Sequence, residues 1–275
     1  MKADLYGIDG KKIKSVELPE QFNEPIREDL IKRTVLSLQA GKRTPYGAKR
    51  YAGMRQAVEI SKRRRKFKGS YGKGISRAPR KTILRRGSQF YWVGAFAPGT
   101  VGGRRAHPPK PGKIWKQKIN TKERRKAIRS ALSATTNLQI VKLRGHKIDF
   151  LPFVVESKIE KIKTTKEAKN VLLSLGLGRE LLRVHKKKVR AGKGKMRGRK
   201  YKLKKGPLIV TSKECLLSKS ASNIAGVDVC VVNNLNAELL APGAVPGRLT
   251  IFTEDALKIL NEKGLFFNKR VGGNK

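Results

Sequence analysis

The sequence predicts an α/β fold, in which a mostly parallel sheet is flanked by helices and interrupted by a long, irregular, basic loop insertion. Two observations lead to this prediction. From residue 150 onward, short apolar runs typical of buried strands alternate with segments of helical pattern. The positive charge is concentrated in residues 42–118 and 183–205, and the rest of the chain has the composition of an ordinary globular domain.

The first elements precede the loop. Residues 3–8 and 12–18 have the pattern of a β-hairpin that turns at Asp9-Gly10. A helix is predicted from Pro25, a residue suited to a first turn, to Gly41, a residue suited to a helix end. Its apolar face comprises Ile26, Leu30, Ile31, Val35 and Leu38.

A second series of elements follows the loop. Asn120-Thr121-Lys122-Glu123 resembles a capping box, and it opens a helix with Ala127, Ile128, Ala131 and Leu132 inward. Buried strands are predicted at 150–155, 208–211, 227–232 and 249–252, and helices at 164–175, 212–221, 235–240 and 253–263. Thr164-Thr165-Lys166-Glu167 resembles another capping box, and Thr253-Glu254-Asp255 puts acids at a helix start.

The charge distribution predicts how the chain is organised. The chain has 65 Lys and Arg against 20 Asp and Glu, a net charge of +45. Residues 42–118 hold 23 Lys and Arg with Glu59 as the only acid, and residues 183–205 hold 13 with none. We therefore expect a globular body of residues 1–41 and 119–275, an extended basic RNA-penetrating loop at 42–118, and a second basic loop at 183–205.

Such an excess of positive charge requires a polyanionic partner. The surface of a membrane is one polyanion that could attract this charge. However, the sequence has no apolar run of membrane-spanning length and no leading signal segment. We expect no membrane partner and a cytoplasmic location. Cys215 and Cys230, each in an apolar stretch, are predicted to be small buried side chains in a reducing compartment.

The loop of residues 42–118 combines flexibility with aromatic rings. It contains 11 Gly and 6 Pro and lacks helical or strand periodicity, which predicts an irregular structure. Nine of the 17 aromatic residues of the chain also lie here. Rings among cations suit stacking on unpaired bases while the cations contact phosphates. The alternative is a small local cluster within residues 90–96.

Catalytic and cofactor motifs were sought and not found. The glycines of residues 192–198 have the wrong spacing for a dinucleotide site, and Gly176-Leu177-Gly178 fits a helix end better. His107, His146 and His185 are far apart in the sequence and have no Cys or Glu at motif spacing. We predict that the chain is not an enzyme and binds no cofactor, metal or small-molecule substrate.

Several stretches resemble a known family, the universal large-subunit ribosomal protein four, in its archaeal and eukaryotic form. The length of the chain suits the archaeal form. The matching stretches cover nearly the whole chain and are residues 25–33, 51–55, 101–109, 127–131, 144–146, 190–201, 240–243 and 246–250.

The resemblance implies a structural role in the large ribosomal subunit. It implies an α/β body on the subunit surface and a long loop threaded into large-subunit ribosomal RNA. The loop would help to line the nascent-peptide exit tunnel, and the chain would support subunit assembly. Neighbouring large-subunit proteins are the implied partners, with protein twenty-two at the tunnel constriction.

The predicted RNA-binding residues are the cations, with selected rings and histidines, of both basic segments and of the adjoining body. They are Lys42, Arg43, Tyr46, Lys49, Arg50, Tyr51, Arg55, Arg63, Arg64, Arg65, Lys73, Arg77, Arg80, Lys81, Arg85, Arg86, Trp92, Arg104, Arg105, His107, Lys110, Arg124, Arg125, Arg129, Arg144, His146, Arg190, Lys193, Lys195, Arg197, Arg199, Lys200, Lys202 and Arg248.

Two other classes of function were weighed. An RNA-modifying enzyme with basic arms would need a cofactor or acid–base site on the sheet, and the sequence offers none. A DNA-compacting protein would bind duplex DNA in long arrays, whereas aromatic-rich loops suit irregular, partly unpaired RNA. The basic face of the helix that follows the loop could also be only a solvated surface.

Overall fold

A computed structural model describes residues 1–151 and 153–267. These residues form two compact units, residues 1–42 with 116–267, here called the body, and residues 43–115, here called the insertion unit. The elements of the body are β1 (Lys2–Tyr6), β2 (Lys12–Glu17), α1 (Glu28–Gly41), α2 (Thr121–Thr136), α3 (Leu138–Leu143), β5 (Val154–Val155), α4 (Thr165–Ser174), α5 (Gly178–His185), β6 (Lys188–Val189), β7 (Tyr201–Lys202), β8 (Leu208–Thr211), α6 (Leu216–Ser222), β9 (Asp228–Val231), α7 (Ala237–Leu240), β10 (Thr250–Thr253) and α8 (Glu254–Glu262).

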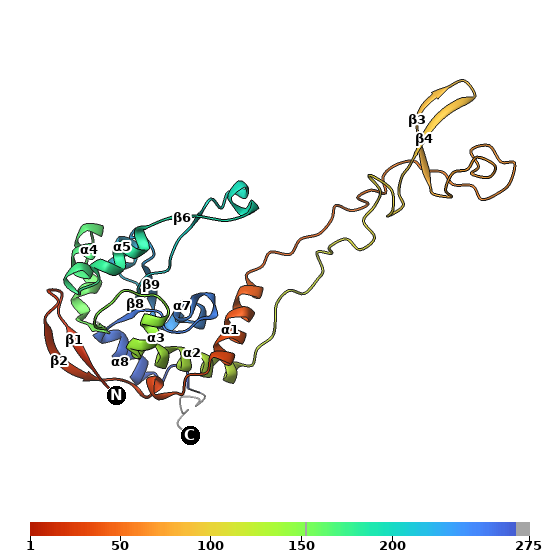
Figure 1. The fold of residues 1–275 in the computed structure, drawn as a ribbon. Helices are drawn as coiled ribbons and strands as arrows, with labels where there is room; N and C mark the ends of the chain where they lie inside the picture. Colours follow the sequence, from red (N-terminus) through yellow and green to blue (C-terminus); the bar gives the residue numbers. More distant parts are fainter. Residues whose placement is uncertain (152, 268–275) are drawn as a thin grey trace. The chain divides into compact units, whose positions relative to one another are not determined.

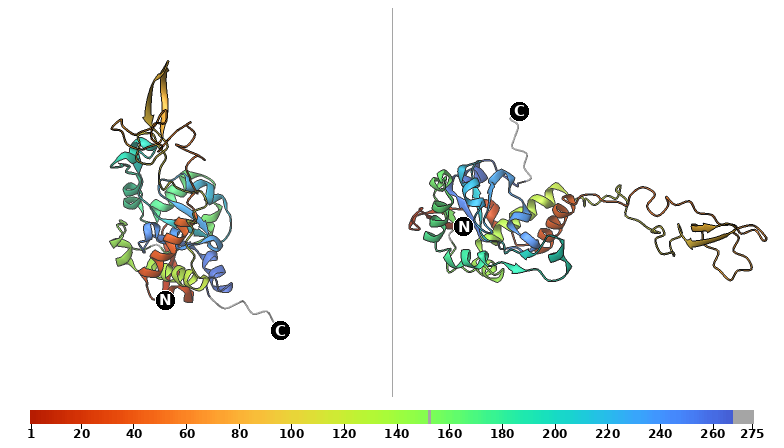
Figure 2. Two further views of the ribbon diagram at one scale, coloured as in Figure 1. Left: turned by 90° about the vertical axis from the view of Figure 1, so that its right-hand side faces the viewer. Right: turned by 90° about the horizontal axis from the view of Figure 1, so that it is seen from above.

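The main sheet of the body has the strand order β2-β1-β5-β10-β8-β9. Every neighbouring pair is parallel except the β1–β2 hairpin. Helices cover both faces of this sheet (Figures 1 and 2). The predicted α/β fold with a mostly parallel sheet is therefore confirmed.

Alternate side chains of the central strands enter two separate cores. Leu208 and Val210 pack with α1, α2, α7 and α8, whereas Ile209 between them packs with α4, α5 and α6. The same alternation places Phe252 in the first core and Ile251 in the second. Because both faces are covered, these strands carry buried apolar side chains on both faces, and this produces the short apolar runs in the sequence.

Of the two predicted capping boxes, the one at Thr164 forms a cap, and Thr253 forms a cap that was not predicted. The hydroxyl of Thr164 accepts a hydrogen bond from the amide of Glu167, and that of Thr253 accepts one from the amide of Ala256. The capping box predicted at Asn120 is wrong, because its side chain makes no cap hydrogen bond at the start of α2. Ile26, predicted to face inward, lies before α1 and is exposed.

Several boundaries differ from the prediction. The strand expected over residues 150–155 is reduced to Val154 and Val155, and Phe150 is exposed. Two short helices, α3 and α5, were not predicted. The helix end assigned to Gly176 is confirmed, since its amide bonds to the carbonyl of Leu173 and its φ is +77°. The helix α5 then begins at Gly178.

The insertion unit contains one regular element, a hairpin of β3 (Arg80–Arg86) and β4 (Gln89–Gly94) (Figure 1). A wholly irregular segment was predicted, and for these residues that prediction is wrong. The turn lies at Gly87, whose φ of +58° suits glycine. Phe90 and Trp92 share one half-buried face of β4, and this supplies the packing that holds the strands together.

Candidate nucleic-acid interface

The carboxyl ends of the parallel strands are the usual place for catalytic groups in such a sheet. In the body this edge holds Glu160, which is buried. Its carboxylate accepts hydrogen bonds from the amide and hydroxyl of Ser212, at 2.8 and 2.7 Å, and from the hydroxyl of Thr253 at 2.7 Å. Glu160 therefore ties together the ends of β8 and β10, and its lone pairs are occupied by the protein itself.

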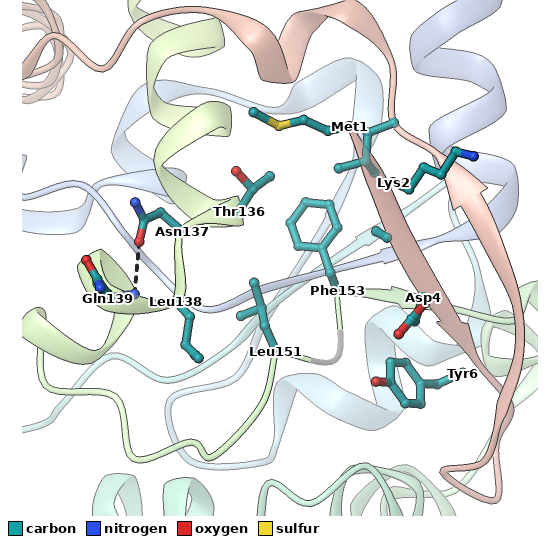
Figure 3. A pocket seen from close by; sticks show the side chains of 12 residues that line it. Met1, Lys2, Asp4, Tyr6, Thr136, Asn137, Leu138, Gln139, Leu151 and Phe153 are labelled. Carbon is teal, nitrogen blue, oxygen red and sulfur yellow. Dashed lines mark hydrogen bonds between the residues drawn. The ribbon is translucent and has the colours of Figure 1, made fainter.

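A hollow of about 860 Å³ lies between the start of β1 and the α2–α3 junction (Figure 3). Its one carboxylate, Asp4, is 2.7 Å from the ammonium of Lys12 and accepts a hydrogen bond from Ser15. Asn137 caps α3 through the amide of Gln139. Asp4 and Asn137 therefore serve the fold. Over residues 1–151 and 153–267, no three Cys, His, Asp or Glu side chains gather to hold a metal ion.

Positive charge dominates the insertion unit. Glu59, the only acid of residues 42–118, lies 3.8 Å from the ammonium of Lys68. The other cations of the unit therefore have no carboxylate within it. The predicted site residues Arg43, Lys49, Arg50, Arg55, Arg63, Arg64, Arg65, Lys73, Arg77, Arg85, Arg86, Arg105, His107 and Lys110 are exposed, and Arg80, Lys81 and Arg104 are half-buried.

The cations of this unit lie over aromatic rings. The guanidinium of Arg43 is 3.7 Å from the centroid of the Trp115 ring, and Tyr46 stacks on the same indole with an interplanar angle of 14°. Together with His107, these rings line a hollow of about 750 Å³. Elsewhere Arg77 lies over Tyr71, 5.1 Å from its centroid. Trp115 was not among the predicted site residues, although its position between two lysines in the sequence could have indicated it.

The aromatic cluster of the β3–β4 hairpin is local. Phe90 packs edge-to-face on Trp92 with centroids 5.2 Å apart, and on Phe67 at 5.4 Å. Arg80 lies over Trp92, 5.2 Å from its centroid. The alternative interpretation, in which these rings pack on one another, therefore holds for Phe90 and Trp92, whereas Tyr91 is exposed on the opposite face.

Glycines bring the two flanks of the insertion unit together. A Cβ at Gly47 would lie 2.3 Å from Pro111, and one at Gly53 would lie 2.6 Å from the Cα of Arg104. The amide of Ala48 also donates to the carbonyl of Pro109. The stretches 51–55 and 101–109, which carry the family resemblance, are therefore in contact. Glycine is needed at positions 47 and 53 because a side chain there would collide with the opposite flank of the insertion unit.

The second basic segment forms a small hairpin of β6 and β7, which projects from the body in Figure 1. Its predicted residues Lys193, Lys195, Arg197, Arg199, Lys200 and Lys202 are exposed and Arg190 is half-buried. Where the hairpin joins the body, a hollow of about 520 Å³ is lined by Arg144, Arg183, Lys188, Lys202, Lys204 and Lys205. Of these, only Arg144 and Lys202 were predicted from the sequence.

Arg248, predicted to bind RNA, lies inside the body. Its side chain is fully buried, and its guanidinium donates to the carboxylate of Asp228 at 2.5 Å and to the carbonyls of Gly206 and Leu239, each at 2.9 Å. The prediction of a surface contact disagrees with this burial, and Arg248 is a structural residue here.

His146, also predicted to bind RNA, is buried in a hydrogen-bonded network. Its Nδ1 donates to Glu180 at 2.6 Å, and its Nε2 accepts from the amide of Leu249 at 3.3 Å. Because Nε2 is an acceptor, the ring is neutral. Burial lowers the pKa of His146 below its ordinary value and outweighs the opposing effect of Glu180.

The two groups beside His146 have shifted pKa values as well. Burial opposes ionisation of Glu180, but hydrogen bonds from Arg183 and His146 outweigh it and hold the pKa of Glu180 at about 2. Burial, with repulsion from Arg248 and Arg183, lowers the pKa of Arg144 to about 10. The guanidinium of Arg144 donates to the carbonyls of Pro242 and Val245, so it also holds a loop of the body.

Several of the remaining predicted cations of the body already bind carboxylates or carbonyls of the chain itself. Arg129 is buried and donates to Glu24 at 2.9 Å. It is therefore not part of the exposed basic face that was predicted for α2. Lys42 pairs with Glu238 at 2.5 Å, and Arg125 donates to the carbonyl of Phe267. Arg124 is exposed. Apart from Arg124, the predicted cations of the body that are exposed and unpaired therefore lie in the segment of the β6–β7 hairpin.

Comparison with known proteins gives a consistent result. A family model described as the Ribosomal protein L4/L1 family matches residues 16–263. Similar proteins named large ribosomal subunit protein uL4 occur in Nanoarchaeum equitans, with 52% identity over 97% of this chain and 100% of that protein, and in Methanosphaera stadtmanae, with 44% identity over 95% and 96%. That of Archaeoglobus fulgidus is 43% identical over 95% of this chain and 99% of its own length.

An α/β body that carries two basic segments and matches such relatives defines the class as a ribosomal protein. The chain belongs to the ribosomal protein L4/L1 family, in its archaeal type. The predicted family is confirmed, and this membership agrees with the prediction that the chain is not an enzyme. In the part of the chain that the structure describes, no helix is long and apolar enough to cross a membrane.

Proposed function

We propose that this chain is a structural constituent of the large ribosomal subunit and binds large-subunit ribosomal RNA. The observation that carries the proposal is the charge of residues 42–118, where 23 cations face a single acid. Only a polyanion neutralises such a segment, and the phosphates of an RNA supply that charge along a continuous path.

The three predicted segments have separate roles in this proposal. Residues 42–118 enter the RNA, residues 183–205 make a second contact, and the body, residues 1–41 and 119–275, remains outside as the anchor. Exposed rings such as Tyr46 and Tyr51 stack on unpaired bases, and Arg and Lys side chains contact phosphates. The stacks of Arg43 on Trp115 and of Arg77 on Tyr71 support this, since each presents a ring together with a cation.

A finer part of the proposal concerns the peptide exit tunnel. The loop of residues 42–118 helps to line the tunnel beside large-subunit protein twenty-two, and the chain supports assembly of the subunit. The support is the resemblance of residues 51–55 and 101–109 to the family that has this role. Contact between these two stretches at Gly53 and Arg104 gives the loop a defined base from which to extend.

Gradient sedimentation of a cell lysate tests the proposal. We expect the chain to travel with the large subunits at low salt and to move to the top of the gradient after ribonuclease treatment. Sedimentation as a free protein at low salt, with the subunits intact, would contradict the proposed function.

A further inference from the structure

The β6–β7 hairpin brings two like charges together. Lys188 and Lys202 are directly opposite each other in its register. Like charges in this position destabilise an antiparallel pair. Each strand has only two residues, and isolated hairpins even of ordinary length are marginal in water. The hairpin therefore needs a source of stability that its own sequence does not provide.

The same two lysines line the basic hollow at the base of the hairpin, together with Arg144, Arg183, Lys204 and Lys205. The neighbouring carboxylates are already engaged. Glu180 accepts from Arg183 at 2.6 Å, and Asp228 accepts from the buried Arg248 and from Lys205. Even with Glu180 and Asp228 counted, the six cations of the hollow and Arg248 leave an excess of five positive charges.

We propose that phosphate groups of an RNA backbone bind in this hollow between Lys188 and Lys202, and that their binding orders the β6–β7 hairpin. A phosphate between the two ammonium groups replaces their repulsion by two charge-assisted hydrogen bonds. The inference rests on the proposed RNA binding and deepens it by assigning a phosphate site on the body.

The distribution of charge favours a backbone over a single anion. One phosphate cannot neutralise an excess of five charges, whereas a polymer brings several at regular spacing. The hairpin continues the hollow with Arg190, Lys193, Lys195, Arg197 and Arg199, and no acid occurs in residues 183–205. A backbone that enters the hollow can therefore continue along the hairpin.

Amide hydrogen exchange of the full chain tests the proposal. The amide of Arg190 donates to the carbonyl of Lys200 only when the hairpin is closed. We expect this amide to exchange rapidly in the free chain and at least about tenfold more slowly when large-subunit ribosomal RNA is bound. Inorganic phosphate at the same total phosphate concentration should protect it far less.

A charge reversal tests whether it is the bound anion that orders the β6–β7 hairpin. Lys188→Glu places a carboxylate opposite Lys202, so the Arg190 amide should be protected without RNA and gain little when RNA is added. Lys202→Glu is the reciprocal variant and should behave in the same way. Lys195→Glu makes the same charge change at an exposed position outside the paired strands, and without RNA it should exchange like the wild type.

The outcomes distinguish this inference from the proposed function. If the chain binds ribosomal RNA but the Arg190 amide stays unprotected, the phosphate site is wrong while the proposed function stands. Equal protection by inorganic phosphate would make the hollow a site for small anions, which also overturns the inference. Failure of the chain to bind ribosomal RNA at all would contradict the proposed function.

Discussion

Arg248 illustrates why a charged residue cannot be assigned to a surface from its charge alone. In the sequence it stands next to a strand and within a stretch that resembles the family, and both observations are compatible with RNA contact. Its burial depends on Asp228 and on carbonyls of two other segments, which only the fold brings together. The same applies to His146 and Arg129, whose partners lie 34 and 105 positions away.

Replacing Arg248 should destabilise the body. Arg248→Met leaves Asp228 with one partner and the carbonyls of Gly206 and Leu239 without donors, so the free energy of unfolding should fall by about 3 kcal/mol. The measurement is urea denaturation of the full chain. Lys205→Met, at the same carboxylate but exposed, is the control and should cost no more than about 1 kcal/mol. Equal costs would contradict the structural role of Arg248.

The network around His146 predicts a stability that depends on pH. Because the pKa of His146 is lowered on folding, the unfolded chain binds the proton more readily, and stability is lost as pH falls below about 6.5. Glu180 affects stability at lower pH. Its pKa is about 2 in the fold against an ordinary value of 4.5, so its contribution to the free energy of unfolding is lost as pH falls between these values.

The variant His146→Gln isolates the first effect, because glutamine does not titrate. Between pH 7.5 and 5.5, the unfolding free energy of the wild type should fall more steeply than that of the variant, by at most about 1.4 kcal/mol per pH unit. The two slopes are obtained from urea denaturation at several pH values. Parallel slopes would show that His146 does not remain neutral in the folded body.

At the scale of elements, the sequence predicts the helices and strands whose buried side chains recur at regular spacing along the chain. The strands β8, β9 and β10 and the helices α1, α2, α4 and α8 have long apolar patterns or capped starts, and each was predicted. The short helices α3 and α5 were missed because each follows a longer helix, α2 or α4, after a break of one to three residues. The strands of the β3–β4 hairpin were missed because exposed Ile83 and Tyr91 break the expected alternation.

Deletion of residues 69–103 tests whether the insertion unit is independent of the body. This segment includes the β3–β4 hairpin and leaves the contact between Gly53 and Arg104 in place. The body has its own two cores, so the variant should melt cooperatively with a midpoint close to that of the wild type. Differential scanning calorimetry gives the answer, and loss of the cooperative transition would mean that the segment belongs to the core of the body.

At the scale of the whole molecule, the separation of charge from apolar patterning was predictable from composition. The two basic segments, one with a single acid and one with none, could be identified by counting, and the structure finds most of their predicted cations exposed. The hollow that combines Arg144 with Lys188 and Lys204 was not predictable, because it joins parts of the body more than 40 positions apart. Its lysines lie in the second basic segment, but only the fold distinguishes them from the other lysines there.

The salt dependence of binding between the full chain and large-subunit ribosomal RNA tests the central claim most directly. If about 10 phosphates are contacted, raising the salt concentration from 50 to 200 mM should weaken the affinity by about 10⁵. An affinity that hardly changes over this range would show that neutralisation of phosphates does not drive the interaction.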